Sequence, residues 1–184
     1  AEPLPAVFRR DLPGRLIEDM KQARMRITGG IYAGRRVSCP KGVIRPAMDR
    51  MRESLFSILG DLGGCSFLDL FAGSGIVGIE AASRGAAPVT LVEKDGRKKE
   101  VIRENISMVE SEITLHIMPV ERFRPKQGPY SVVYLDPPFK YVDKPSLITM
   151  VQEHGRLREP GGRIIHHPSP GQDWPPRPGS LACT

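Results

Sequence analysis

A carboxylate, two prolines and an aromatic ring follow one another in the segment Leu-Asp-Pro-Pro-Phe, directly after an apolar run. Asp136 and the backbone carbonyl of Pro137 can each accept one hydrogen of an exocyclic amino group on a nucleobase, which turns its delocalised lone pair toward an electrophilic methyl group. Pro137 and Pro138 fix the turn and leave its carbonyls free, because proline has no N–H. Phe139 offers a face on which a flipped-out base can stack.

The same four residues could instead do no more than end a strand. An Asp followed by prolines is common as a helix cap or as part of a turn. The position of the segment favours the chemical interpretation, because it follows directly on a buried strand and lies several strand–helix units beyond a glycine-rich loop. We therefore expect this segment to bind and orient a base for methyl transfer.

A second candidate site is the segment Asp-Leu-Phe-Ala-Gly-Ser-Gly, which begins at Asp69. Gly73, Gly75 and Gly78 fit the G-x-G-x-x-G pattern, in which the backbone approaches a ligand closely and the next helix presents free N–H groups. Glu93 ends the following strand, where a ribose-binding acid belongs. Asp69 can meet the ammonium group of a methionine moiety, which favours S-adenosylmethionine over NAD. The glycines could also serve only a tight turn.

Alternating helices and strands must position both segments. We expect helices at 48–62, 75–85, 96–109 and 146–157 and strands at 66–71, 89–93, 113–118, 131–135 and 161–167. Apolar runs separated by helices predict parallel strands covered on both faces, hence a doubly wound, mostly parallel α/β domain. In such a sheet, ligands bind beyond the carboxyl ends of the strands.

The segment before this domain is basic and reads as a glycine-turned β-hairpin over 26–40. From Arg24 to Arg52, one acid stands against eight basic residues, which are Arg24, Arg26, Arg35, Arg36, Lys41, Arg45, Arg50 and Arg52. Clustered Arg and Lys supply the sequence-independent part of nucleic-acid affinity. A solvated basic face is the alternative.

The composition sets wider limits. A chain of 184 residues with 40% hydrophobic and 26% charged residues fits one globular domain. Its net charge of +6 agrees with an acidic partner. No apolar run approaches the roughly 20 residues that span a bilayer, so we expect no membrane partner. Three distant cysteines favour reduced thiols and a cytoplasmic location. No set of residues has the spacing of a metal site.

Four segments are expected along the chain. We predict a flexible extension at 1–24, a basic hairpin arm at 25–47, a catalytic domain at 48–167 and a proline-rich tail at 168–184. Five prolines within eleven residues resist regular structure in the tail.

The chain resembles known enzymes in several of these segments. LDLFAGSGIVGIEAASRGA, LVEKD and LDPPF look like the class I amino-methyltransferases. RITGGIYAGRRV and RPAMDRMRESLFSIL resemble the RsmD family, the bacterial 16S ribosomal RNA guanine-N2 methyltransferases. The resemblance covers about residues 25–165. It implies a Rossmann-like fold and methyl transfer from S-adenosylmethionine to the exocyclic N2 of a guanine in small-subunit ribosomal RNA.

The resemblance also implies roles for residues. Cofactor binding is expected of Asp69, Phe71, Gly73, Ser74, Gly75, Glu93 and Val120. The target base is expected at Asp136, Pro137, Pro138 and Phe139. Contacts with RNA are expected of four arginines, which are Arg35, Arg36, Arg45 and Arg52. Some of these arginines could instead brace the active site. The partner would be ribosomal RNA in the small subunit or its assembly intermediate, and the enzyme would be a cytoplasmic monomer.

The sequence departs from the family pattern at three places. Ala47 replaces the usual Thr after Arg-Pro, and Pro119 stands where an acid near the adenine is common, so that adenine recognition rests on the Val120 N–H and apolar packing. The tail lacks the pattern of further strands. A DNA adenine-N6 or other amino-methyltransferase, an NAD-dependent oxidoreductase and a catalytically weak RNA-binding relative remain alternatives.

Overall fold

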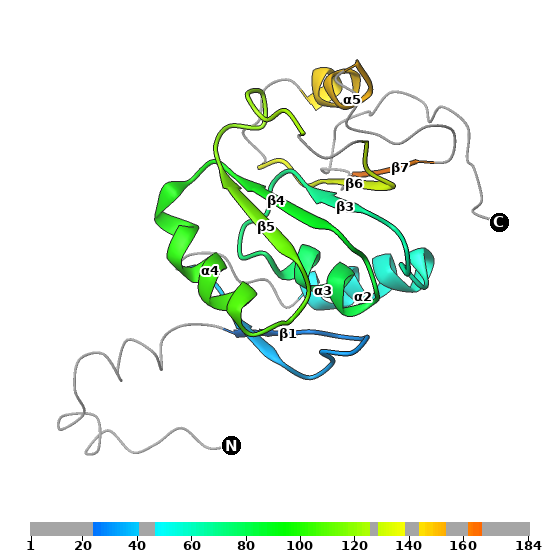
Figure 1. The fold of residues 1–184 in the computed structure, drawn as a ribbon, viewed down its shortest axis with the longest axis vertical. Coiled ribbons are helices and arrows are strands. Elements are labelled where there is room, and N and C mark those ends of the chain that lie inside the picture. Colours follow the sequence, from blue (N-terminus) through cyan, green and yellow to red (C-terminus); the bar gives the residue numbers. More distant parts are fainter. Residues whose placement is uncertain (1–23, 41–46, 126–128, 139–143, 154–161, 167–184) are drawn as a thin grey trace.

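A parallel sheet forms the centre of the protein (Figure 1). The computed structural model describes residues 24–40, 47–125, 129–138, 144–153 and 162–166. Five parallel strands have the order β5-β4-β3-β6-β7, and two antiparallel strands form a separate hairpin, β1-β2. The strands are β1 (Arg24–Arg26), β2 (Arg36–Ser38), β3 (Phe67–Asp69), β4 (Val89–Glu93), β5 (Ile113–Ile117), β6 (Val132–Leu135) and β7 (Arg163–His166). The predicted mostly parallel α/β fold with an N-terminal hairpin is confirmed.

Helices cover both faces of the sheet. They are α2 (Ala47–Leu59), α3 (Ile76–Ser83), the short 3₁₀ helix η2 (Gly96–Lys98), α4 (Lys99–Ser107) and α5 (Lys144–Glu153). Side chains of α2, α3 and α4 pack against one face, and those of α5 pack against the other. Within the described stretches, no helix is both long enough and apolar enough to cross a bilayer.

The central strands are apolar along their whole length because both of their faces are covered. In β6, Val132 and Tyr134 face the cluster under α2 and α3, whereas Val133 and Leu135 face the cluster under α5. All four side chains are buried. This explains why the sequence shows continuous apolar runs here rather than alternation of apolar and polar residues.

Several element boundaries differ from those expected. The segment 96–109 is not one helix but η2 followed by α4, and the Asp95 side chain caps η2 by accepting from the backbone N–H of Arg97. Strand β3, expected to run to residue 71, ends at Asp69. The Asp69 carboxylate accepts from the backbone N–H of Phe71, and the chain turns there. The expected extension at 1–24, apart from Arg24, and the tail at 168–184 lie outside the described residues.

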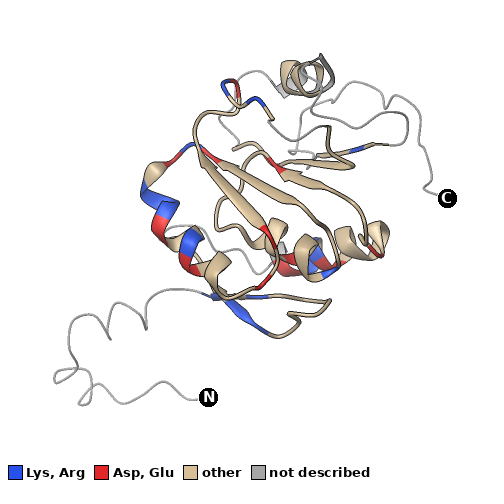
Figure 2. Cartoon of the chain, in the orientation of Figure 1, with Lys and Arg blue, Asp and Glu red and all other residues tan. Residues whose placement is uncertain are grey.

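The hairpin has an apolar inner face and a basic outer face. Met25 in β1 and Val37 in β2 are buried and belong to one cluster with Ile76 and Ile79 of α3. Arg24, Arg26 and Arg36 alternate with these residues and are exposed, and Figure 2 shows blue stretches along the hairpin. Alternation with a period of two is what a β-hairpin needs to pack one face on a helix.

A buried carboxylate joins the hairpin to two helices. Glu80 of α3 is fully buried and accepts from the backbone N–H of Thr28 at 3.2 Å and from Nε of Arg52 in α2 at 3.1 Å. Arg84 adds a second cationic contact at 3.3 Å. The Thr28 hydroxyl also donates to this carboxylate. Glu80 therefore fixes the position of the hairpin and of α2 relative to α3.

We expect Glu80→Ala to lower the free energy of unfolding by about 3–5 kcal/mol, because it removes the buried carboxylate that pairs with Arg52 and leaves this buried arginine with the more exposed Asp49. Urea unfolding followed by circular dichroism measures the change. Glu53→Ala is the matched control: Glu53 is exposed and pairs with the exposed Arg26 at 3.8 Å, and we expect a change below about 1 kcal/mol. Equal losses in the two variants would show that the Glu80 contacts do not hold the hairpin.

Candidate active site

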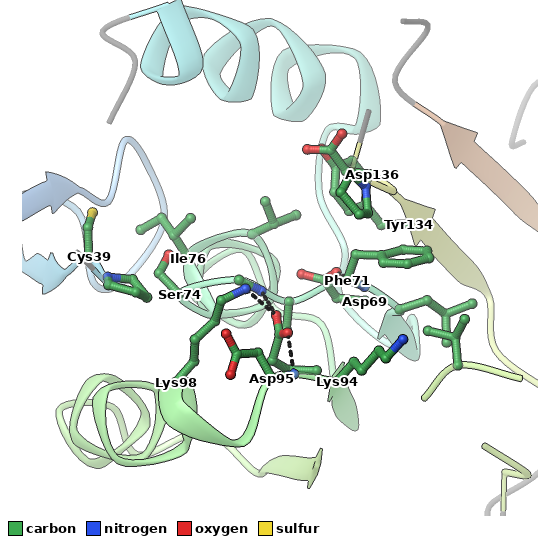
Figure 3. A pocket seen from close by; sticks show the side chains of 18 of the residues that line it. Cys39, Asp69, Phe71, Ser74, Ile76, Lys94, Asp95, Lys98, Tyr134 and Asp136 are labelled. Carbon is green, nitrogen blue, oxygen red and sulfur yellow. Dashed lines mark hydrogen bonds and ion pairs between the residues drawn. The ribbon is translucent and has the colours of Figure 1, made fainter. Parts of the chain in front are cut away.

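A cavity of about 690 Å³ opens at the carboxyl edge of the parallel sheet. Asp69 ends β3, Glu93 ends β4 and Asp136 follows β6, so that three neighbouring strands each deliver one carboxyl group to it. The chain goes from β3 outward to β4 and β5, then returns to β6 on the other side, and ligands of open α/β sheets bind at this switch point. Figure 3 shows Asp69 between Asp136 and Asp95.

A tight glycine loop forms one wall of the cavity. Gly73 and Gly75 have φ angles of +60° and +81°, a region that residues with side chains rarely adopt. The N–H of Gly73 donates to Glu93 Oε2 at 2.9 Å. A Cβ at Gly78 would lie 2.2 Å from the Leu91 side chain, so this glycine lets α3 approach β4 closely. The three glycines are therefore required by turn geometry and by packing.

Asp69 is a buried carboxyl group with an unused oxygen. Its Oδ1 accepts from the backbone N–H of Phe71 at 3.1 Å, whereas Oδ2 is buried and has no hydrogen-bond partner among the described residues. Burial raises the pKa of Asp69 to about 7, and the negative charges of Asp136 and Glu93 contribute to this rise. A carboxylate of this kind is well suited to a cationic ligand, because a cation would supply both the missing partner and the missing charge.

Glu93 is held in a defined orientation at the end of β4. Its Oε2 accepts from the N–H of Gly73 and from Nζ of Lys98 at 3.1 Å, and its Oε1 accepts from the N–H of Asp95 at 2.8 Å. Backbone donors on both sides fix the carboxylate beside the cavity. This arrangement suits the binding of paired hydroxyl groups, such as those of a ribose.

The Asp-Pro-Pro segment follows β6 at the same cavity. Asp136 is half-buried, Pro137 is buried and Pro138 is exposed, and both Asp136 and Pro138 line the cavity. Tyr134, on β6, also lines it, and burial together with the negative charges of Asp136 and Asp69 holds the pKa of its hydroxyl far above the usual value. Tyr134 is therefore a neutral side chain that can donate a hydrogen bond.

The cavity brings most of the predicted cofactor residues together. Those that line it are Asp69, Phe71, Gly73, Ser74, Glu93 and Val120. Gly75 lies behind them, where its added Cβ would meet Ile102 and Leu91 at 3.3 Å. Phe139, predicted to stack on a base, lies outside the described residues.

Other cavity residues were not predicted from the sequence. Asp95 and Lys98 come from the turn after β4, and Asp95 could have been found because an Asp two residues beyond a strand end is a common helix cap. Met25, Cys39 and Pro40 come from the hairpin. No local signal marks these three residues, because only the docking of the hairpin brings them to the cavity.

The four predicted RNA-binding arginines have different surroundings. Arg36 is exposed on the hairpin. Arg35 is exposed too, but its guanidinium donates to the carbonyl of Met108 and lies 4.8 Å from the ring centroid of Tyr32. Arg45 lies outside the described residues.

Arg52 is buried rather than available to RNA. Its relative exposure is 1%, and its guanidinium contacts Glu80 at 3.1 Å and Asp49 at 3.0 Å. The expectation that it approaches RNA is wrong for this reason. It braces the contact of α2 with the hairpin, which the sequence could not distinguish from a surface role because both use an arginine in a basic segment.

The sheet order and the cavity at its switch point match the Rossmann-like fold of the class I methyltransferases. A precorrin-6y C5,15-methyltransferase from Geobacter metallireducens shares this fold with a TM-score of 0.59 at 20% identity, over 71% of this chain and 66% of that one. The family described as Conserved hypothetical protein 95 matches residues 25–182, and the chain belongs to this family. The resemblance to the RsmD methyltransferases is thereby confirmed.

Two relatives illustrate the similarity. The ribosomal RNA small subunit methyltransferase D of Escherichia coli is 32% identical over 140 residues, which are 74% of this chain and 71% of that protein. The solved structure of a hypothetical protein from Thermus thermophilus has a TM-score of 0.67 and 32% identity, over 77% of this chain and 84% of that one.

We expect Asp69→Asn to stabilise the protein at pH 8 by about 2–4 kcal/mol and to have little effect near pH 4. A carboxyl group with a pKa near 7 in the folded state and near 4 in the unfolded state destabilises the fold above pH 7, and this cost disappears as the pH falls toward 4. Denaturant unfolding between pH 4 and 8 measures the effect.

Asp95→Asn is the control for this titration. The pKa of Asp95 is lowered to about 2 by its hydrogen bonds with Arg97, so its loss should destabilise the protein near neutral pH rather than stabilise it. A gain in stability of Asp69→Asn that is the same at pH 4 and pH 8 would contradict the raised pKa.

Proposed function

We propose that this protein transfers a methyl group from S-adenosylmethionine to the exocyclic N2 of a guanine in small-subunit ribosomal RNA. The observation that carries the proposal is the meeting of Asp69, Glu93 and Asp136 in one cavity at the ends of three neighbouring strands. These carboxyl groups suit an ammonium, a ribose and an amino group, respectively. The printed name of the Escherichia coli relative supports ribosomal RNA of the small subunit as the substrate.

The residues of the cavity fit the proposed cofactor. The buried Oδ2 of Asp69 has no described partner, which suits the ammonium group of the methionine moiety. Glu93 is oriented by two backbone N–H groups and suits the ribose hydroxyls. Phe71 and Val120 offer apolar contact for the adenine. When bound, this cofactor supplies a methyl group activated by a sulfonium.

Asp136 is the residue proposed to orient the target. Its carboxylate and the carbonyl of Pro137 would each accept one hydrogen of the guanine amino group, so that the nitrogen lone pair points into the cavity. As the new N–C bond forms, the amino group becomes more acidic, and the Asp136 carboxylate can hold the proton that leaves the nitrogen. Tyr134, a neutral donor on β6, lines the same cavity.

The basic hairpin supports RNA as the substrate. Arg24, Arg26 and Arg36 project from its outer face, and residues of the same hairpin line the cavity from the inside. Phosphate contacts there would position an RNA without reading its sequence. We further propose that the enzyme acts as a monomer in the cytoplasm on the small subunit or its assembly intermediate, whose shape presents one guanine to the cavity.

The decisive experiment is methyl transfer from labelled S-adenosylmethionine to small ribosomal subunits that lack the modification, followed by mapping of the modified base. Label at N2 of one guanine is the expected result. Label at an adenine amino group, or equal label in DNA, would replace the proposal by another amino-methyltransferase activity. Binding of the cofactor and of RNA without any transfer would identify an RNA-binding relative without catalytic activity.

In the same assay, Asp136→Ala should lower turnover by a factor of about 10²–10⁴, the range for removing a positioned catalytic group. Affinity for S-adenosylhomocysteine and the melting temperature should change little, because Asp136 lies beyond the cofactor residues of β3 and β4. Glu104→Ala, which removes an exposed carboxylate from α4, should leave turnover unchanged. Normal turnover of Asp136→Ala would assign the Asp-Pro-Pro segment to a structural turn.

Reversing the charges of Arg24 and Arg36 should weaken RNA binding and flatten its dependence on salt, since fewer phosphates are neutralised. For every phosphate that is no longer neutralised, the slope of log K against log salt should become shallower by about 0.7–0.9. Arg103→Glu, on the exposed side of α4, changes the net charge of the protein without altering the hairpin and is the control. An unchanged slope in the double variant would make the hairpin a solvated surface only.

A further inference from the structure

Asn105 makes more buried polar contacts than its place in α4 requires. The side chain is fully buried. Its Nδ2 donates to the carbonyl of Ser38 at 2.9 Å and to the carbonyl of Ser74 at 2.8 Å, and its Oδ1 accepts from the N–H of Ser38 at 2.8 Å. Both hydrogens of the amide are used, and the direction of each contact is fixed because carbonyl groups only accept.

The two residues that Asn105 joins belong to different functional parts of the protein. Ser74 lies between the two glycines of positive φ in the loop that lines the cavity. Ser38 ends β2, and Asn105 binds both of its backbone polar groups in the way that a neighbouring strand would. Cys39 and Pro40 follow Ser38 directly and line the same cavity.

One side of the hairpin faces the solvent, and the other side faces the cavity and the glycine loop. Its outer arginines, Arg24 and Arg36, face the solvent. On the inside, its Met25 lines the cavity, and its β2 is tied through Asn105 to the glycine loop. A displacement of the hairpin moves Ser38, which either carries the Asn105 amide with it or breaks buried hydrogen bonds. In the first case the amide also displaces the Ser74 carbonyl that it binds, and in the second the Ser38 carbonyl loses its donor.

We propose that Asn105 is a positioning residue that couples RNA binding on the hairpin to cofactor binding at the glycine loop. The coupling rests on the proposed function, since it requires that both ligands bind where they have been assigned. RNA that holds the hairpin in its docked position also holds the Ser74 carbonyl, and thus the loop, in the conformation that binds the cofactor. Cofactor binding in turn stabilises the docked hairpin.

The physical basis is the cost of breaking buried hydrogen bonds. The Ser38 and Ser74 carbonyls both depend on the same buried amide group, so that neither partner can shift alone without leaving a polar group unsatisfied. The conformation of the glycine loop is therefore linked to the docked position of the hairpin. Coupling between two binding sites is reciprocal, and factors of about 5–150 are typical.

The test is a binding cycle with S-adenosylhomocysteine and in vitro transcribed small-subunit ribosomal RNA. Calorimetry gives the dissociation constant of S-adenosylhomocysteine with and without saturating RNA, and filter binding gives that of RNA with and without S-adenosylhomocysteine. We expect each ligand to strengthen the binding of the other by the same factor, at least about fivefold. In Asn105→Ala, the factor should fall below about two, whereas each ligand still binds alone.

Tyr32→Phe is the matched control. The Tyr32 hydroxyl accepts from the N–H groups of Glu110 and Ser111, so its loss loosens the hairpin where it meets these two residues and leaves the Asn105–Ser74 hydrogen bond in place. This variant should keep the coupling, which separates the role of Asn105 from a general weakening of the hairpin. Asn105→Leu nearly keeps the volume of the side chain and removes its donors and its acceptor, and it replaces Asn105→Ala if that variant does not fold.

The outcomes are distinct. If both ligands bind the wild-type protein but neither affects the other, the coupling is overturned and the proposed function stands. If the coupling is the same in the Asn105 variant as in wild type, Asn105 is a structural residue only. A failure of S-adenosylhomocysteine to bind the wild-type protein would overturn the proposed function and the coupling together. A failure of the RNA transcript to bind would overturn the coupling but not the proposed function, because the proposed substrate includes the assembled small subunit.

Discussion

Three carboxyl groups share one cavity because β4, β3 and β6 run parallel, lie side by side and end at the same edge of the sheet. Asp69, in the middle, is buried and surrounded by negative charge, which raises its pKa and disfavours its ionised form. The arrangement is unfavourable for the protein alone and favourable for a cation. Much of the remaining structure holds this cluster and the backbone around it in position.

The positions of the surrounding elements depend on a few buried polar side chains. Glu93 receives N–H groups from the glycine loop and from the turn before α4. Glu80 ties α3 to α2 and to the hairpin, and Asn105 ties α4 to the hairpin and to the loop. Apolar packing holds the same elements together, but it tolerates small displacements. Hydrogen bonds to buried groups do not, so they determine the register of these contacts.

The hairpin connects the proposed roles of cofactor and RNA. Its alternating residues give it an apolar face that packs on α3 and a basic face toward the solvent, and its end reaches the cavity. A compact domain can thus combine a phosphate-binding surface with part of the cofactor site. Because the hairpin belongs to both the RNA-binding surface and the cofactor site, a ligand bound at one of them can affect binding at the other through the hairpin.

The sequence by itself determined the fold class, the hairpin and most of the cofactor residues, because continuous apolar runs, glycines at strand–helix turns and acids at strand ends are local signals of a parallel sheet and its switch point. Only the tertiary structure decided that Arg52 is buried against Glu80 and that Asn105 joins Ser38 to Ser74. It also decided that Cys39 lines the cavity. These contacts join residues 28 to 67 positions apart, and the type of one residue does not reveal which distant partner it will meet.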